Sequence, residues 1–343
     1  MAKKRKKCYS GIGGQAVLEG VMMKNQDHYA VAVRKPNGEI EIETQEYLGV
    51  IHGSVVKKIP FIRGIFNLID SMRLGMRAIN YSADFYEDET AKETLSDKAL
   101  NKVFKDKAET ILMGLTTILA VALAVGIFMV LPYYITSLFD TFVRSKTLLL
   151  ALEGVIRIVI FVLYVIAISI MKDIRRLYRY HGAEHKCINC IERGRPLTVR
   201  NVKKSSRKHK RCGTSFMLYV MFISCILFFF ITVENPVQRV LLRVALIPVV
   251  AGISYEIIRI AGKSSSLIMN LLSYPGMLLQ KLTTKEPDEE MILVAIASVE
   301  AVFDWKAFLV ENFDADLEEL KAIQAEDKEK YKDKAYTDQE HIE

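Results

Sequence analysis

Residues 148–171 read LLLALEGVIRIVIFVLYVIAISIM, a long apolar run interrupted by the charged side chains of Glu153 and Arg157. A transmembrane helix needs about 20 mainly apolar residues to cross the hydrocarbon core of a bilayer. The chain is 51% hydrophobic, with a mean hydropathy of +0.17. The sequence therefore predicts an α-helical polytopic membrane protein with about four transmembrane helices. The other three predicted helices cover residues 111–131, 216–233 and 237–260.

The distribution of lysine and arginine predicts how these helices are oriented, because short basic loops remain on the cytoplasmic side. Residues 172–215, between the second and third helices, are densely basic, whereas the loop between the first two helices contains Arg144 and Lys146. An even number of spans places both termini on one side, and the cluster Lys3–Lys7 agrees with a cytoplasmic N-terminus. We therefore expect a multi-pass protein of the plasma membrane with both termini in the cytoplasm.

The net charge of +7 comes mainly from the basic loops that determine this orientation. Anionic lipid and RNA are compatible with it as secondary partners. Four of the five cysteines fall on the predicted cytoplasmic side, where thiols stay reduced. Metal binding, reactivity and simple packing remain as their roles. These four are Cys8, Cys187, Cys190 and Cys212.

Composition divides the chain into segments. They are a cytoplasmic β-rich unit (1–59), an amphipathic and charged helical connector (60–110), transmembrane helices 1 and 2 (111–171), a basic cytoplasmic His/Cys loop (172–215), transmembrane helices 3 and 4 (216–262), and a cytoplasmic C-terminal helical segment with a charged tail (263–343).

The N-terminal segment contains a clear hairpin signal. Residues 29–34 and 39–44 alternate as strands do, and Pro36-Asn37-Gly38 between them is a turn sequence. Gly11, Gly13 and Gly14 could suggest a phosphate-binding loop, but no apolar strand precedes them and no Lys-Ser/Thr pair follows. We expect these glycines to form tight turns.

Helical periodicity recurs on both sides of the predicted membrane segments. Between Pro60 and Asn80 apolar residues repeat at helical spacing with arginines among them, which suits either a helix on the inner membrane surface or a core helix of the cytoplasmic unit. Residues 82–110 are expected to form a charged helical arm. Residues 288–309 are predicted to be a helix, followed by a charged, frayed tail.

The stretch with the clearest chemistry is HGAEHKCINC at residues 181–190, followed by HKRCG at 209–213. On a helix, His181 and His185 stand one turn apart on one face and can reach a single ion. Glu184 stands beside them, in the His-x-x-Glu-His order of inverted zinc-peptidase motifs. In such sites the histidines hold the metal and the carboxylate takes a proton from water.

Two kinds of zinc site compete for these residues. A closed structural site would use four protein ligands, for example His185, Cys190, His209 and Cys212, and would fold the basic loop. A catalytic site would keep one coordination position open next to Glu184. The candidate ligand set is therefore His181, His185, Cys190, His209 and Cys212, with Glu184 as the candidate catalytic residue.

Two carboxylates near the predicted membrane also need partners. Glu153 and Arg157 could form an intramembrane ion pair, which would mark a functional site, or could reach to the outer interface. Glu256 could supply a ligand to the histidine pair or pair with Arg259, and pairing is the favoured interpretation.

Six motifs stand out along the chain. They are GGQAVLEGVMM (13–23), RG (63–64), HGAEHK (181–186), RCGTSF (211–216), SYE (254–256) and TTKEPD (283–288). Together they resemble the YqhQ-like family, a group of bacterial integral membrane proteins often labelled metal-dependent enzymes. The resemblance covers most of the chain and implies a polytopic protein with a cytoplasmic His/Glu/Cys cluster. Because the family pattern keeps a cysteine at Cys190 but not always at Cys187, it favours Cys190 and Cys212 as ligands.

Taken together, the sequence predicts an integral membrane metal-binding protein, and a zinc-dependent hydrolase at the cytoplasmic membrane face is one function compatible with it. The N-terminal glycines suggest close backbone packing, which could be against the His/Cys loop. The alternative is a non-enzymatic membrane scaffold or membrane-protein biogenesis factor with structural zinc. Its basic loop would contact the ribosome or RNA, nascent chains, other membrane proteins or anionic lipid. A homo-oligomer is also compatible with the sequence.

Overall fold

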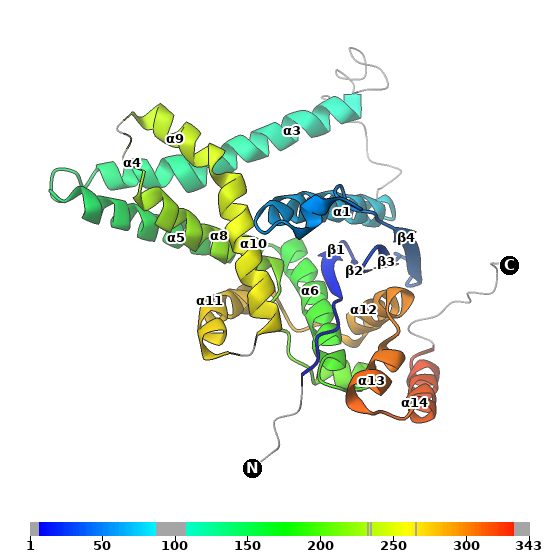
Figure 1. Ribbon diagram of the computed structural model, residues 1–343. Helices are drawn as coiled ribbons and strands as arrows, with labels where there is room; N and C mark the ends of the chain where they lie inside the picture. Colours follow the sequence, from blue (N-terminus) through cyan, green and yellow to red (C-terminus); the bar gives the residue numbers. More distant parts are fainter. Residues whose placement is uncertain (1–6, 87–107, 232, 234, 265, 333–343) are drawn as a thin grey trace. The chain divides into compact units, whose positions relative to one another are not determined.

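The computed structural model describes residues 7–86, 108–231, 233, 235–264 and 266–332, in two compact units. Unit 1 comprises residues 1–86, 166–219 and 251–343, and unit 2 comprises residues 87–165 and 220–250. The N-terminal β-rich segment is therefore not a unit of its own, because it shares a core with the His/Cys region and the C-terminal helices. Figure 1 shows the elements of each unit.

Unit 1 is built on a four-stranded antiparallel sheet whose strands follow one another in chain order. The predicted hairpin is confirmed, with Gly38 in the left-handed region at φ +94°. The expected turn role of Gly13 and Gly14 is wrong, because both belong to the first strand. The strands are β1 (Gly13–Val17), β2 (Gly20–Asn25), β3 (His28–Arg34) and β4 (Ile40–Glu46).

Both faces of this sheet are covered, as alternation along its strands requires. Val21 and Met23 point to the face occupied by helices α6 (Lys172–Ile191) and α12 (Glu289–Val302). Met22 points to the other face, against helix α1 (Ile62–Asp84). The sheet is thus a central layer between helices (Figure 1).

Helix α1 is buried against the sheet on one side, and its opposite side is apolar but exposed. Leu74 and Ala78 pack on the sheet, which confirms the core-helix interpretation for that side. On the opposite side Ile69, Met72 and Met76 are 40%, 64% and 53% exposed. A membrane-surface role for this second face stays a prediction.

The region expected to be a basic loop, residues 172–215, begins with the long helix α6, followed by the short helix α7 (Val199–Lys203). Further along, Asp288 caps α12 through the backbone N–H of Met291, as the Glu-Pro-Asp sequence predicts. The single helix predicted over 288–309 is divided, because Asp304 caps a new helix. The remaining elements of unit 1 are η1 (Val55–Lys58), α11 (Leu267–Thr283), α13 (Trp305–Phe313) and α14 (Leu317–Lys330).

Part of the expected frayed tail is therefore helical. Asp316 accepts a hydrogen bond from the backbone N–H of Glu319 and caps α14, and Leu320 is buried. Residues 333–343 lie outside the described part of the chain, as does most of the charged arm predicted at 82–110.

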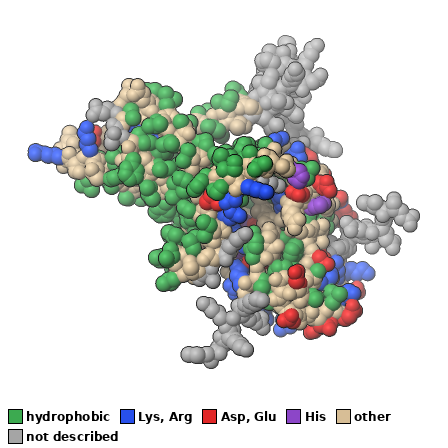
Figure 2. Space-filling model, in the orientation of Figure 1, with side chains coloured by type: hydrophobic (Ala, Val, Ile, Leu, Met, Phe, Trp, Pro, Cys, Tyr) green, Lys and Arg blue, Asp and Glu red, His purple; other side chains and the backbone are tan. Residues whose placement is uncertain are grey.

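Unit 2 contains apolar helices. Residues Gly114–Ser137 and Lys146–Ile170 are each long and apolar enough to cross a membrane. The first combines part of α3 (Ala108–Val125), a π-helical turn (Gly126–Val130) and α4 (Leu131–Ser137), and the second is α5. Hydrophobic side chains dominate the visible surface of this unit in Figure 2.

The other two predicted spans are less regular. Helices α9 (Pro236–Ala245) and α10 (Ile247–Lys263) are bent by 41° at their junction, and together they form a third candidate span. Pro248 at the start of α10 lacks a backbone N–H and explains the break. Helix α8 (Gly213–Phe229) is apolar but shorter than a full span. The described residues thus contain two or three candidate spans, and the expected four are supported in part.

The sheet packing predicts one sensitive position. A Cβ atom at Gly20 would lie 2.3 Å from the carbonyl oxygen of Ala32 in the neighbouring strand, so Gly20→Ala should destabilise unit 1 by about 1–3 kcal/mol. At Gly13, in the same sheet, an added Cβ meets nothing within 4 Å. Thermal unfolding in detergent should show a lower midpoint for Gly20→Ala and little change for Gly13→Ala; equal midpoints would refute the packing described.

Candidate metal centre

Helix α6 buries an unusually polar face. The exposed fractions of Glu184, His185, Lys186 and Asn189 are all below 5%. Burying such groups is costly unless each has a hydrogen-bond or charge partner. The partners come mainly from the backbone of residues 203–208, which covers the helix.

The two histidines of this face are oriented by backbone carbonyls. His181 Nδ1 lies 2.9 Å from the carbonyl oxygen of Thr283, and His185 Nδ1 lies 2.6 Å from that of Arg207. A carbonyl oxygen only accepts hydrogen bonds, so each Nδ1 carries the proton and donates it. Each Nε2 is then available as a ligand, which is how metal-binding histidines are usually oriented.

Cys212 completes a group of three possible ligands. Its Sγ lies 3.2 Å from His181 Nε2, and one ligand atom from each of His181, His185 and Cys212 lies within 4.8 Å of the others. A tetrahedral zinc ion with bonds of about 2.0–2.3 Å holds its ligand atoms about 3.3–3.8 Å apart. The three side chains therefore need only small rotations to bind one ion.

The electrostatics of this group favour a thiolate. Burial alone would raise the pKa of Cys212, but the neighbouring His181 and His185 hold it well below its usual range. Burial likewise opposes a charge on His181, yet the Cys212 thiolate and Glu184 raise the pKa of His181 to about 9. Since the thiolate is the form that binds metal, Cys212 is prepared for ligation.

Glu184 lies beside the three possible ligands. Its Oε2 is 3.8 Å from His181 Nε2, and burial raises the pKa of its carboxyl group. A Cβ atom at Gly14 would lie 3.0 Å from Glu184 Cγ, so strand β1 passes directly over this side chain. The glycine-rich segment does pack closely against the His/Cys region, as the sequence suggested.

One side of the group opens into a cavity of about 110 Å³. Its lining includes the three possible ligands, Glu184, His209, Arg211 and the segment of Gly13 and Gly14. Liquid water occupies about 30 Å³ per molecule, so the cavity has space for a metal ion with water or a small reacting group.

Side chains of α6 and α11 hold the segment that carries Cys212. Lys186 Nζ donates to the carbonyl oxygen of Lys203 at 2.8 Å, and Asn189 Nδ2 donates to those of Ser206 and Lys208 at 2.7 and 3.0 Å. Gln280 binds both the N–H and the carbonyl of His209. These bonds determine where Cys212 lies relative to the histidines.

The structure does not bring Cys190 and His209 into this group. Cys190 Sγ faces the carbonyl oxygens of Pro196 and Arg195 at 3.4 and 3.7 Å, and burial raises its pKa to about 12. His209 Nε2 lies 3.6 Å from Glu192 Oε2, and burial lowers the pKa of His209 to about 4. The closed combination of His185, Cys190, His209 and Cys212 is therefore not assembled.

Glu192 is a structural residue that the sequence did not reveal. Its buried carboxylate contacts Arg211 at 2.5 Å and Lys7 at 3.2 Å. Burial opposes its ionisation, but His209 and Arg211 hold the pKa of Glu192 well below its usual range. This anion anchors Arg211, the neighbour of Cys212.

Glu256, considered as an extra ligand, is bound elsewhere. It forms a two-pronged contact with Arg63, with distances of 2.7 and 2.6 Å, and a longer one of 3.5 Å with Arg259. The expected pairing is confirmed, although Arg63 is the principal partner. The RG and SYE motifs thus meet each other, and Gly64 makes space for Tyr255.

The motifs that converge on this site also identify the family. A family model described as "Protein of unknown function (DUF1385)" matches residues 59–305, a range that includes His181, His185 and Cys212. The chain belongs to this family. The resemblance inferred from the sequence motifs is thereby confirmed.

A relative of this family extends the match to nearly the whole chain. The chain is 35% identical over 302 residues to "Uncharacterized protein YqhQ" of Bacillus subtilis (strain 168), covering 88% of this chain and 94% of that protein. No solved structure matches the chain.

The geometry predicts which residues retain metal. His185→Ala and Cys212→Ala should each remove a ligand and lower the zinc content of the purified protein by more than half. Cys190→Ala is the matched control, because its thiol is buried but faces away, and it should retain zinc. Elemental analysis of the three variants measures this; zinc loss in Cys190→Ala alone would contradict the ligand set.

Proposed function

We propose that the chain is a zinc-dependent hydrolase of the cell membrane, with its site on the cytoplasmic side and both termini in the cytoplasm. The observation that supports this most directly is the meeting of His181, His185 and Cys212 at a cavity that Glu184 also lines. The basic residues of 172–215 support the cytoplasmic placement.

The donor set fits zinc in a catalytic arrangement. Structural zinc sites are usually closed by four protein ligands, whereas catalytic sites use three and leave the fourth position to water or substrate. Here three nitrogen and sulfur donors converge and line a cavity, so a zinc ion held by them would have room for water or substrate. Zinc bound there would activate water and polarise a carbonyl or phosphoryl oxygen.

Glu184 is placed to move the proton in such a reaction. Its carboxylate lies next to the ligands without belonging to their group, and burial raises its pKa, which is the direction of shift that suits a carboxyl group for general acid–base catalysis. It would accept a proton from the attacking water and return it to the leaving group. Strand β1 at Gly14 keeps the side chain in place.

The small cavity restricts what can react. About 110 Å³ admits a small acyl or similar group but not a folded peptide segment. A substrate would therefore insert only its scissile end, with the rest outside. The open position and the adjacent acid–base group are the features that favour an enzyme over a scaffold held together by structural zinc.

Cobalt substitution tests the open position. In the cobalt(II)-loaded protein, acetohydroxamate should change the visible absorption spectrum, because it can occupy the free coordination position. Glu184→Gln should retain the metal but bind acetohydroxamate about 10–100-fold more weakly, since a charge-assisted hydrogen bond to the bound inhibitor is lost.

The control is Glu318→Gln, whose exposed carboxylate pairs with Lys321 on α14, outside the cavity lining, and which should leave acetohydroxamate binding unchanged. A cobalt spectrum insensitive to acetohydroxamate would mean a closed site and would rule out the hydrolase. Loss of metal from Glu184→Gln would make Glu184 a ligand rather than a proton carrier.

A further inference from the structure

Helix α11 of unit 1 exposes a continuous apolar face. The large side chains on this face are between 39% and 83% exposed. Positions 267, 271, 274 and 278 recur at spacings of four and three residues, which places them on one side of the helix. The segment between Leu267 and Gln280 contains no charged residue. An exposed apolar surface of this kind commonly marks a contact with a membrane or another protein. The exposed side chains are Leu267, Ile268, Leu271, Leu272, Tyr274 and Leu278.

The opposite face of α11 is packed and hydrogen-bonded. A Cβ atom at Gly276 would lie 2.6 Å from Ser215 Oγ, and Gln280 Nε2 donates a hydrogen bond to that oxygen at 2.8 Å. The hydroxyl of Tyr219 donates to the carbonyl oxygen of Leu272 at 3.3 Å. Because these contacts fix the rotation of the helix, its apolar face cannot turn inward.

The start of α11 lies close in the chain to the end of a candidate membrane span. The α10 part of the third candidate span ends at Gly262, and α11 begins at Leu267. A connection of this length reaches at most about 18 Å when fully extended. Lys210 Nζ donates to the carbonyl oxygen of Ser264 at 3.2 Å and to Asn270 Oδ1 at 2.6 Å, so the connection is held against the helix. The first turns of α11 therefore belong near the membrane surface.

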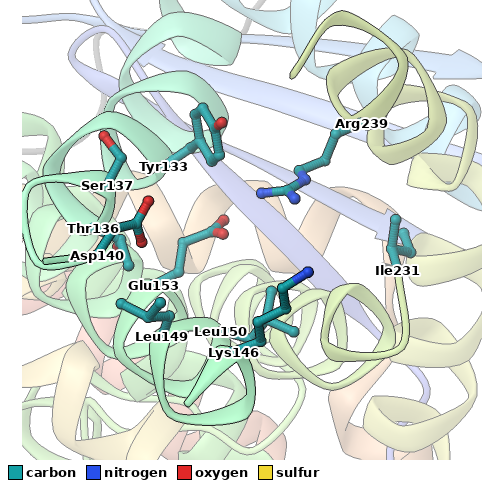
Figure 3. A pocket seen from close by; sticks show the side chains of 10 residues that line it. All are labelled: Tyr133, Thr136, Ser137, Asp140, Lys146, Leu149, Leu150, Glu153, Ile231 and Arg239. Atoms are coloured by element: carbon teal, nitrogen blue, oxygen red, sulfur yellow. The ribbon is translucent and has the colours of Figure 1, made fainter. Parts of the chain in front are cut away.

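The ends of the candidate spans in unit 2 show a different pattern. A cavity of about 220 Å³ lies where α4 ends and α5 begins, and Figure 3 shows its lining side chains. Hydroxyl and charged groups line it, including those of Ser137, Asp140 and Lys146, as is usual where a span reaches water. The exposed face of α11 is apolar apart from the hydroxyl of Tyr274. It therefore suits hydrocarbon rather than water.

We propose that α11 is an interfacial helix, which lies along the membrane surface with Leu267, Leu271 and Leu278 among the lipid chains. Helices of this kind bury their apolar face by about 5–10 Å at the boundary between headgroups and acyl chains. Tyr274 suits that depth, because its ring is apolar and its hydroxyl is polar. This membrane contact does not depend on the proposed hydrolase activity.

The same helix also contributes to the candidate metal centre. Gln280 binds the backbone N–H and carbonyl of His209, and the carbonyl oxygen of Thr283 accepts the hydrogen bond that orients His181. Lipid contact along the first turns of α11 thus holds the histidines at its other end near the membrane surface.

Fluorescence quenching by brominated lipids in liposomes measures the depth of α11. The full-length Leu271→Trp variant should lose more emission to lipids brominated near the headgroup than to lipids brominated near the chain end, because an interfacial helix stays shallow. Val159→Trp, at an exposed position on the candidate span α5, should show the reverse order. The native Trp305 is buried in unit 1, and its emission in wild type is subtracted as background.

The matched control is Leu317→Trp, because Leu317 is an exposed leucine of unit 1 on α14. Neither lipid should quench its tryptophan, whereas Leu267→Trp should repeat the result of Leu271→Trp. Quenching of both α11 variants no greater than that of Leu317→Trp would overturn the proposal, because protein, such as a second copy of the chain, or water would then cover the face. Strongest quenching near the chain end, as in Val159→Trp, would mean deep insertion and would overturn it as well.

Discussion

The buried polar face of α6 is the constraint on which unit 1 depends. An unsatisfied polar group in a core costs about 1–3 kcal/mol, and more if it is charged. Lys186, Asn189 and His185 avoid this cost by donating to successive carbonyl oxygens between Lys203 and Lys208. The same bonds hold the following segment against the helix and bring Cys212 to the histidines. The residues of the motif outside the possible ligand group therefore determine where Cys212 lies.

Glycines allow the other segments to reach this helix. A Cβ at Gly182 would lie 2.0 Å from the carbonyl oxygen of Lys285, so only glycine lets residues 283–288 pass so close. From that position Thr283 orients His181, and Glu286 neutralises Lys186. Gly14 plays the same part for strand β1 above Glu184. Three motifs distant in the sequence thus meet because small residues permit backbone contact with α6.

The sequence pattern predicted the features that depend on a single helix or turn. It could not predict the features that depend on contacts between several segments. The β3–β4 hairpin, the capped start of α12 and the histidine pair follow from turn, capping and helical spacing. Helical spacing alone also argues against Cys190, which follows His181 by nine residues, about two and a half turns, and so faces the opposite side of α6. Cys212 was already a candidate from the sequence, but its position beside the histidines depends on the hydrogen bonds of residues 203–208. The role of Glu192 depends on tertiary contacts.

The candidate metal centre buries negative groups that need positive charge nearby. A thiolate and a carboxylate lie together with little access to water, which is unfavourable unless positive charge is close. Protonation of His181, whose pKa is raised to about 9, is one source of that charge. A divalent cation would be a better one, because it would leave both imidazoles neutral and balance one thiolate and one carboxylate. Protons and a metal ion would therefore compete for the same nitrogens.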